Sequence, residues 1–469
     1  MINRASSHPL NGDFLTAITA LLQERVTDST PLREQHSHGE GIADAGLPDL
    51  VAFAHTNEEV AGVLALCNCF EVPVVPFGAG SSVEGQVAAV CGGVSLDLTR
   101  MNSILDISPE SLDCRVQAGG TREQLNHDLR AKGLFFTVDP GADATIGGMA
   151  ATRASGTNAF RYGTMREAVL GLTVATPEGR IIRTGGRARK SSAGLDLTRL
   201  YIGSEGTLGV ITEIQLRLQG LPEAILAASC QFEDFAAAVD SVSAALQSGL
   251  RLARIELIDE IQMKACIGYS KLTGFAEKPT LFLEFHGSPN SITEDLLNMQ
   301  ELAVSFGAHN FVQAERPEER NRLWTARHNA YHATKWLCPG KSNMGTDACV
   351  PISELATCLM ETKKDILASG MVAPIVGHVG DGNFHLGIMH DPADLVETAK
   401  AEELAARVSE RAIRFGGTCS GEHGIGLHKM RFMQSEHGDA LDVMRMIKAA
   451  LDPQNIMNPC KMLPLGEKI

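Results

Sequence analysis

The spacing of apolar residues divides the chain into two regions of different character. Between residues 49 and 220, short apolar runs alternate with glycine-rich turns, a pattern typical of short strands joined by tight loops. Helical periodicity predicts helices over residues 13–26 and 56–69. The apolar runs predict strands at Leu50–Phe53, Val72–Val75, Val94–Asp97, Cys114–Ala118, Leu172–Ala175 and Val210–Leu218.

From about residue 221 the pattern changes to longer helices. Apolar positions repeat with helical spacing over residues 232–249, 392–415 and 439–451. Shorter runs at residues 252–257, 280–285 and 372–376 predict strands of a second sheet. No internal repeat or low-complexity linker separates these elements, and 469 residues are enough for two or three domains.

Composition and charge argue against several classes of protein. The net charge of −15 argues against a nucleic-acid partner, because a protein that binds the phosphate backbone needs a basic surface. We find no signal peptide before Pro31 and no uninterrupted apolar stretch of about 18 residues, so no membrane-spanning helix is expected. The eleven cysteines form no C-x-x-C motif, which argues against iron–sulfur and zinc-ribbon sites and suits a reducing cytoplasm.

Glycine-rich loops in the first region are candidates for a cofactor site. The loop Pro76-Phe-Gly-Ala-Gly-Ser-Ser follows a predicted strand, and its backbone N–H groups can point at a diphosphate. It lacks the third glycine of the nicotinamide fingerprint. Two further segments, D-P-G-A-D-A-T-I-G-G from Asp139 and I-G-S-E-G-T-L-G-V-I-T from Ile202, follow in order.

These motifs, together with R-Y-G-T-M-R-E-A-V-L-G-L from Arg161, resemble the FAD-binding domain of the vanillyl-alcohol oxidase type throughout residues 50–220. The resemblance implies an α+β fold. A FAD-binding domain of two small subdomains would span residues 1–220, and a cap domain with an antiparallel sheet would span residues 221–425. The C-terminal segment, residues 426–469, would return to the first domain.

The resemblance also implies which residues hold FAD. The first loop would hold the pyrophosphate, the second would line the flavin ring and ribityl chain, and the last would lie near the adenosine. Residues 77–85 contain no histidine or cysteine, so we expect non-covalent FAD. The residues assigned in this way are Pro76, Gly78, Ala79, Gly80, Ser81, Ser82, Pro140, Thr145, Gly147, Gly148, Ser155, Asn158, Tyr162, Gly163, Glu205, Gly206, Ile211 and Asn458.

A candidate metal site lies in the second region, in Gly377-His-Val-Gly-Asp-Gly-Asn-Phe-His385. Asp381-Gly382 is a strong signal for a two-residue hairpin turn. Folding about that turn places His378 directly opposite His385, with Cβ atoms about 4.5–5.5 Å apart. At that separation two imidazoles can bind one metal ion. Isolated histidines are usually structural, but a cross-strand pair beside a turn is less easily explained in that way.

The segment Ser420-Gly-Glu-His-Gly adds a carboxylate and a further imidazole, Glu422 and His423. Two histidines and one carboxylate leave coordination positions open, as in catalytic metal sites. Both segments resemble signatures of the D-lactate, glycolate and D-2-hydroxyglutarate dehydrogenase group. That resemblance implies that His378, His385 and Glu422 bind a divalent ion, zinc or alternatively manganese, and that His423 is the catalytic base.

The same resemblance suggests how the substrate is bound. Arg327, on a predicted helix, matches an arginine that holds the substrate carboxylate, and Lys341 lies one residue from the position of a second cation. Gly387 and Tyr331 stand where D-2-hydroxyglutarate enzymes carry polar residues. We therefore expect a short D-2-hydroxy acid, with D-lactate favoured, to be oxidised by hydride transfer to the flavin.

Several alternatives stay open. The chain is alternatively the flavin subunit of a glycolate oxidase, a D-2-hydroxyglutarate dehydrogenase, or a redox-inert metallohydrolase whose glycine loops are only turns. No second redox centre is evident, so a cytochrome, a quinone, an electron-transfer flavoprotein or oxygen must reoxidise the flavin. A homodimer is an open alternative, and we expect a cytoplasmic location, with peripheral attachment to a membrane as the alternative.

Overall fold

The computed structural model describes residues 10–40 and 46–464, and the chain divides into two compact units. Unit 1 comprises Met1–Ser155, Gly163–Leu221 and Glu422–Ile469, and unit 2 comprises Gly156–Tyr162 and Pro222–Gly421. The chain therefore leaves unit 2 four residues earlier than the expected boundary at residue 425. The short segment 156–162, expected in the first domain, belongs to unit 2.

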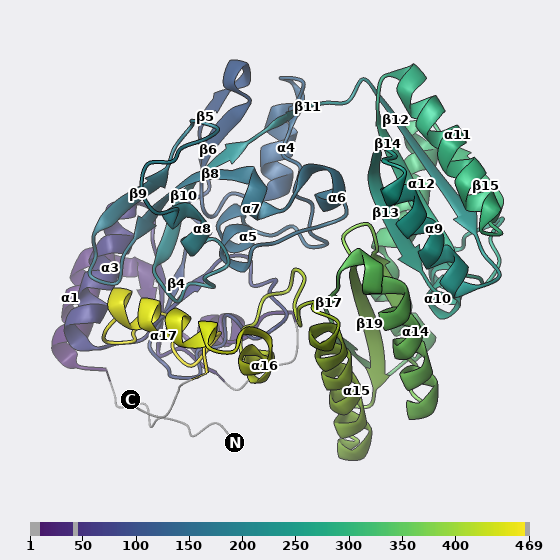
Figure 1. Cartoon of the computed structure of the whole chain (residues 1–469). Coiled ribbons are helices and arrows are strands. Elements are labelled where there is room, and N and C mark those ends of the chain that lie inside the picture. Colours follow the sequence, from purple (N-terminus) through teal and green to yellow (C-terminus); the bar gives the residue numbers. More distant parts are fainter. Residues whose placement is uncertain (1–9, 41–45, 465–469) are drawn as a thin grey trace. The chain divides into compact units, whose positions relative to one another are not determined.

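Unit 1 contains a four-stranded, a five-stranded and a two-stranded sheet (Figure 1). Its strands are β1 (Val26–Thr27), β2 (Leu50–Phe53), β3 (Val74–Phe77), β4 (Val94–Asp97), β5 (Ile104–Ser108), β6 (Asp113–Gln117), β7 (Leu134–Phe135), β8 (Val169–Ala175), β9 (Ile181–Gly185), β10 (Val210–Arg217) and β11 (Gln219–Gly220). In the order β1-β2-β4-β3, the last three strands run parallel. The order β5-β6-β10-β8-β9 is antiparallel throughout, and β7 pairs with β11.

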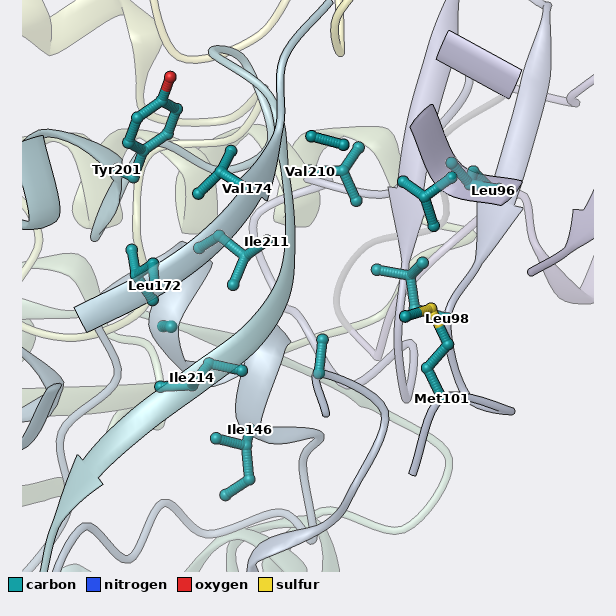
Figure 2. Packing of buried hydrophobic residues seen from close by; sticks show 14 of the residues in the cluster. Leu96, Leu98, Met101, Ile146, Leu172, Val174, Tyr201, Val210, Ile211 and Ile214 are labelled. Atoms are coloured by element: carbon teal, nitrogen blue, oxygen red, sulfur yellow. The ribbon is translucent and has the colours of Figure 1, made fainter. Parts of the chain in front are cut away.

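One apolar core joins these sheets. Leu96 of β4, Leu172 of β8 and Ile214 of β10 belong to the same buried cluster (Figure 2). Burying such side chains contributes about 1.5–3 kcal/mol each, so the two larger sheets are stabilised together. The surrounding helices are α1 (Gly12–Leu22), α2 (Thr30–Gln35), α3 (Asn57–Phe70), α4 (Arg122–Arg130), α5 (Ile146–Thr152), α7 (Met165–Ala168), α8 (Leu197–Tyr201), α16 (Met433–His437) and α17 (Ala440–Leu451).

Unit 2 is built on an antiparallel sheet. Its strands are β12 (Ala224–Gln231), β13 (Leu252–Ile258), β14 (Thr280–Gly287), β15 (His309–Ala314), β16 (Ser342–Gly345), β17 (Ala348–Cys349), β18 (Ile375–His378) and β19 (Asn383–His390). They follow the order β15-β12-β14-β13-β18-β19-β16, and β17 also pairs with β19. Its helices are α6 (Ala159–Tyr162), α9 (Phe235–Gln247), α10 (Glu260–Ser270), α11 (Pro289–Ser305), α12 (Pro317–His328), α13 (Ala330–Leu337), α14 (Ile352–Ser369) and α15 (Leu395–Arg414).

The two faces of this sheet pack against different helices. Ile255 and Leu257 of β13 belong to a large apolar cluster with α9, α11, α14 and α15. Phe282 of β14 belongs to a smaller cluster with α10, α12 and α13. Successive strand residues point to opposite faces, so Glu256, between Ile255 and Leu257, faces the smaller cluster. This face carries the polar residues of unit 2 described below.

The hairpin that carries the predicted histidine pair has a different register from the one expected. His378 lies opposite Asn383, and Val376 lies opposite His385. The connection has four residues, with Asp381 N donating to His378 O (3.0 Å) and Gly382 N donating to Val379 O (3.3 Å). Loops of four residues are most often built around a type I turn, whereas the expected two-residue loop would use a type I′ or II′ turn. The expected direct pairing is therefore wrong, although a shift of two residues keeps both histidines on one face.

Among the residues that the structure describes, no helix combines the length and the apolarity that crossing a membrane requires.

Candidate active site

Glycine segments far apart in the sequence converge in unit 1. A Cβ atom on Gly78 would lie 2.3 Å from Thr145 Oγ1, and one on Gly206 would lie 2.9 Å from Pro76 Cγ. Glycine is required at both positions because neither leaves room for a side chain. Thr145 also caps α5, its Oγ1 accepting a hydrogen bond from Gly148 N at 3.3 Å. The three predicted FAD segments are thus in contact with one another.

The first of these loops contains a polar atom that suits a phosphate ligand. Ser82 Oγ is buried and has no hydrogen-bond partner within the described part of the chain. Leaving a buried hydroxyl unpaired costs about 1–3 kcal/mol, and a diphosphate oxygen would accept its hydrogen bond. Gly80, with φ of 68°, shapes the same loop. The residues present therefore fit FAD.

Most residues assigned to FAD lie in unit 1, but two belong to unit 2. Asn158 Oδ1 accepts a hydrogen bond from Arg254 Nε at 2.8 Å, and Tyr162 Oη lies 2.7 Å from His286 Nδ1. Burial raises the pKa of the Tyr162 phenol. These two side chains therefore support the polar face of unit 2. The residues placed in unit 1 are Pro76, Gly78, Ala79, Gly80, Ser81, Ser82, Pro140, Thr145, Gly147, Gly148, Ser155, Gly163, Glu205, Gly206, Ile211 and Asn458.

Glu205 and Asn458 support the segment after residue 421. The Glu205 carboxylate accepts hydrogen bonds from Ile425 N (2.6 Å) and Gly426 N (2.8 Å). Burial raises the pKa of Glu205 to about 7, against the opposing effect of these two bonds. Asn458 Nδ2 donates to the carbonyl oxygens of Glu205 (2.6 Å) and Gln86 (3.1 Å). The Glu205 carboxylate therefore binds the backbone of this segment, and its expected place near the adenosine stays a prediction.

In unit 2, the predicted metal-binding histidines lie together. The ring centroids of His378 and His385 are 5.5 Å apart. His378 Nδ1 donates to Glu256 Oε1 (2.7 Å), and His385 Nδ1 donates to Thr346 O (2.9 Å). A carboxylate and a carbonyl oxygen only accept, so each Nδ1 atom carries the proton of its hydrogen bond. Metal-binding histidines are commonly held in this way.

Glu256 is a buried bridge between His378 and Arg327. Arg327 donates to Glu256 Oε2 from Nε (3.0 Å) and from Nη2 (2.5 Å), while His378 bonds the other oxygen. Burial acts to raise the pKa of Glu256, but His378 and Arg327 outweigh it and hold that pKa below its ordinary value. Removing the carboxylate would leave a buried guanidinium unpaired and the imidazole unoriented.

The hairpin is also tied to the chain that leads to Glu422. Asp347, which is buried, accepts from Asn383 Nδ2 (2.7 Å) and from Ser420 Oγ (2.9 Å). A Cβ atom on Gly421 would lie 2.2 Å from Asn383 Nδ2, so the backbone passes very close to the residue opposite His378. Glu422 is the next residue in the chain, although it is counted with unit 1.

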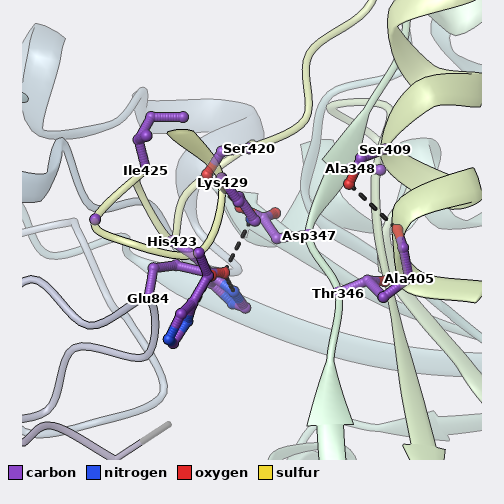
Figure 3. A network of polar contacts seen from close by, with 12 residues as sticks. Glu84, Thr346, Asp347, Ala348, Ala405, Ser409, Ser420, His423, Ile425 and Lys429 are labelled. Atoms are coloured by element: carbon purple, nitrogen blue, oxygen red, sulfur yellow. Dashed lines mark hydrogen bonds and ion pairs between the residues drawn. The ribbon is translucent and has the colours of Figure 1, made fainter. Parts of the chain in front are cut away.

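In unit 1, the predicted base His423 lies beside a buried carboxylate. His423 Nδ1 is 3.4 Å from Glu84 Oε1, and Lys429 Nζ is 3.0 Å from the same oxygen (Figure 3). His428 Nδ1 is 3.4 Å from Glu84 Oε2. Burial acts to raise the pKa of Glu84, but Lys429 and the two histidines hold it well below its usual range. Glu84 is thus an anion within ion-pair distance of His423, His428 and Lys429.

The other predicted substrate residues lie elsewhere on unit 2. Lys341 precedes β16, whose Ser342 pairs with His390, so it lies beyond the end of β19 that is farthest from His385. It forms an exposed ion pair with Glu397. Along a strand, five residues span about 17 Å. The structure therefore does not bring Lys341 to the histidine pair, which corrects that expectation.

Tyr331 and Gly387 differ in exposure and in the space around them. The Tyr331 side chain is 47% exposed, with Lys335 Nζ 4.6 Å from its ring centroid. At Gly387, by contrast, a Cβ atom would lie 2.9 Å from Thr334 Cγ2 and 3.1 Å from Asn343 Oδ1. A longer residue at Gly387 would have to displace these neighbours.

Sequence reasoning missed Glu84, Glu256 and Asp347 as members of these clusters. Glu256 had a visible signal, since a charged residue within the apolar strand Ile255-Glu-Leu-Ile258 must be paired if it is buried. Glu84 and Asp347 had none, because both lie in loops where acidic residues are common.

Comparison with known families places both regions among FAD enzymes. Residues 48–185 match the model described as "FAD binding domain", and residues 221–462 match "FAD linked oxidases, C-terminal domain". The α+β fold expected from the resemblance is confirmed by a solved structure, the 4-ethylphenol oxidase from Gulosibacter chungangensis. That structure is similar with a TM-score of 0.78 at 15% identity, over 96% of each chain.

Curated relatives match nearly the whole chain. A probable mitochondrial D-lactate dehydrogenase from Danio rerio is 46% identical, covering 95% of this chain and 90% of the relative. A mitochondrial D-lactate dehydrogenase (cytochrome) from Arabidopsis thaliana is 41% identical over 96% and 80%. The glycolate oxidase subunit GlcD from Bacillus subtilis is 33% identical over 94% of each. The expected cytoplasmic location is wrong by this comparison, because the first two relatives are named as mitochondrial.

Proposed function

Because this chain belongs to the family of FAD-linked oxidases, we propose that it is an FAD-dependent dehydrogenase. It oxidises a short D-2-hydroxy acid, with D-lactate favoured, to the 2-keto acid. The observation that carries the proposal is the His378–His385 pair, whose ring centroids are 5.5 Å apart and whose Nδ1 atoms both donate to oxygen atoms of unit 2. The names of the relatives supply the substrate class and its handedness.

His378 and His385 would hold a divalent metal ion, with Glu422 as the third ligand. In support of this ligand set, Ser420 donates to Asp347, which also binds Asn383 of the hairpin, and the Gly421 backbone passes close to Asn383. The chain spans at most about 3.6 Å per residue. Zinc accepts two histidines and one carboxylate and keeps an open position, with manganese as the alternative. When bound, the ion supplies a Lewis acid that lowers the pKa of a substrate hydroxyl.

Arg327 binds the substrate carboxylate. Glu256 engages Nε and one N–H of Nη2, so the remaining donors are the two on Nη1 and the second on Nη2. Because Glu256 fixes the guanidinium on one side, Arg327 is pre-oriented and loses little side-chain entropy when the substrate arrives. The same carboxylate orients His378, which couples the substrate-binding residue to the metal-binding residue.

His423 removes the hydroxyl proton. The Glu84 carboxylate, 3.4 Å from His423 Nδ1, stabilises the imidazolium formed after proton transfer. Lys429 and His428 keep Glu84 anionic for this task. FAD, when bound by the glycine loops of unit 1, supplies the acceptor for the hydride that leaves C2.

A screen of D- and L-2-hydroxy acids with an artificial electron-accepting dye tests the proposal. We expect D-lactate to exceed D-2-hydroxyglutarate in kcat/KM by about 100-fold, because a buried and unpaired second carboxylate costs several kcal/mol. The contacts around Gly387 support the size limit. Comparable efficiency with D-2-hydroxyglutarate would contradict the size argument, and faster oxidation of L-lactate would contradict the handedness.

The likeness to GlcD favours a second candidate, the flavin subunit of a glycolate oxidase. The same dye assay separates the two. An isolated chain that turns over D-lactate efficiently is a self-sufficient dehydrogenase. A chain that binds FAD but oxidises glycolate only after a partner subunit is added is a glycolate oxidase subunit. The metallohydrolase alternative is not retained, because both regions match FAD families. Among the proposed acceptors, the relatives' names favour a cytochrome.

A further inference from the structure

Two cysteines that are 369 residues apart in the sequence meet in unit 1. The Sγ atoms of Cys91 and Cys460 are 3.0 Å apart, and both side chains are partly exposed. An S–S bond is about 2.0 Å long, so the sulfur atoms need to approach by about 1 Å to be joined. Cys91 immediately precedes Gly92 and Gly93, both with positive φ, at the start of β4.

The backbone at Cys460 adopts a conformation that favours glycine. Its φ is 65°, in a segment where Asn458 (41°) and Met462 (64°) are also left-handed. Side chains other than glycine are strained there, and such strain persists where the surroundings or a function demand that residue. A cysteine in this position, in contact with a second cysteine, therefore points to a role for the thiol itself.

The two thiols are also chemically unequal. The hydrogen bond between the two sulfur atoms lowers the pKa of Cys460 to about 6 against the opposing effect of burial, and the Lys461 ammonium also lowers it. The same bond, together with burial, raises the pKa of Cys91. Cys460 is therefore the thiol that ionises more readily, which suits it to attack and Cys91 to resolve.

We propose that Cys91 and Cys460 form a reversible disulfide when the protein meets a peroxide. The Cys460 thiolate attacks one oxygen of the peroxide, which breaks the O–O bond and gives a sulfenic acid and hydroxide. The Cys91 sulfur then attacks the Cys460 sulfur, forms the S–S bond and releases water, with its thiol proton leaving on that water. Two thiols are oxidised and one peroxide is reduced, and a small dithiol reverses the step.

The disulfide would fasten the C-terminal segment to the flavin-binding unit. In the dithiol form this segment is docked by Val74 N donating to Ile456 O (2.8 Å) and Asn458 N donating to Val74 O (2.8 Å). β3, which begins at Val74, leads directly into the glycine loop at Pro76. The bond would make this docking covalent and would close a very long loop, which restricts the unfolded chain.

The test uses the FAD-containing protein, treated with a small molar excess of hydrogen peroxide and then alkylated under denaturing conditions. Mass spectrometry should find two fewer alkylated cysteines than in a dithiothreitol-treated sample, and a peptide that links Cys91 to Cys460. Dithiothreitol should restore both thiols. The oxidised protein should unfold at a temperature higher by about 5 °C.

Variants decide which thiols react. Cys91→Ser and Cys460→Gly should each abolish the linked peptide, and glycine suits the left-handed backbone at residue 460. Cys69→Ser, at an exposed cysteine of α3, is the matched control and should leave it unchanged. The proposal fails if Cys91 and Cys460 stay alkylated in oxidised wild type, or if the linkage joins other cysteines. Both contradicting results are measured on the wild-type protein, so the test stays decisive even if a variant fails to fold.

Discussion

The candidate FAD site of unit 1 is built mainly from backbone, whereas the candidate metal site of unit 2 is built from side chains. In unit 1, Gly78 and Gly206 let loops approach Thr145 and Pro76 at distances that exclude a side chain. In unit 2, the candidate ligands are imidazoles fixed by Glu256 and by Thr346 O. A backbone cradle needs the absence of side chains at a few positions, while a metal site needs correctly oriented side chains and their partners.

This difference separates the expected effects of substitution. Damage to the glycine loops should release FAD and leave the metal bound, and damage to the histidine face should do the reverse. Each variant below is therefore followed by two measurements, flavin content and metal content, besides turnover. A variant that loses both groups would indicate general unfolding.

The largest effect is expected from His385→Ala, which removes one of the two imidazoles of the hairpin. Turnover should fall to background because two protein ligands do not hold a catalytic ion. Metal analysis should find substoichiometric ion, while the flavin spectrum stays that of wild type. His332→Ala, on an exposed position of α13, is the control. Full activity of His385→Ala would contradict the proposed metal site.

His423→Ala should reduce kcat by roughly 10²–10⁴-fold, the usual contribution of a positioned general base. Both FAD and metal should stay bound, because His423 is expected to hold neither. Steady-state kinetics with D-lactate measure the effect, and a change confined to KM would make His423 a binding residue instead.

Glu256→Gln tests the bridge between His378 and Arg327. The amide keeps the shape but loses the charge, so Arg327 is left buried without its counter-ion and His378 is held less firmly. Metal affinity should fall about 10–100-fold, the usual cost of changing a partner of a metal-binding histidine. Competition with a chromophoric chelator measures it. Unchanged metal affinity with a raised KM would confine Glu256 to orienting Arg327.

The smallest effect is expected from Gly78→Ala, whose Cβ would meet Thr145 Oγ1. Overpacking of this kind costs about 1–3 kcal/mol, so FAD affinity should fall by about tenfold or more while metal binding is unaffected. Fluorescence of released flavin measures the affinity. The double variant with Thr145→Ala removes the contacting oxygen and should recover part of the loss. A double variant no better than Gly78→Ala would show that the contact is not the cause.

Local pattern was enough to predict much of the fold. Leu50–Phe53 and Val94–Asp97 are strands with the predicted bounds, because an apolar run between glycine turns has few other ways to be buried. The final helix begins at Ala440, one residue from the predicted start. Such elements depend on a few neighbouring residues, and the sequence displays those directly.

The site was less predictable because its partners are distant in the sequence. The Asp381-Gly382 turn signal led to a register two residues away from the observed one, since Gly382 O accepts from Val350 N and Gly380 packs on Phe160. Those contacts are invisible in a local pattern. Lys341 was expected at the site from the family resemblance, but it lies beyond the end of β19 that is farthest from His385.

Anaerobic reduction of the flavin tests the central claim most directly. The purified holoprotein is mixed with D-lactate in the absence of any acceptor, and the long-wavelength absorbance of the flavin is followed before and after treatment with a chelator. The account predicts rapid bleaching by D-lactate, none by L-lactate, and loss of bleaching after chelation that returns with zinc or manganese. Bleaching by D-lactate at an undiminished rate in metal-free protein would contradict it.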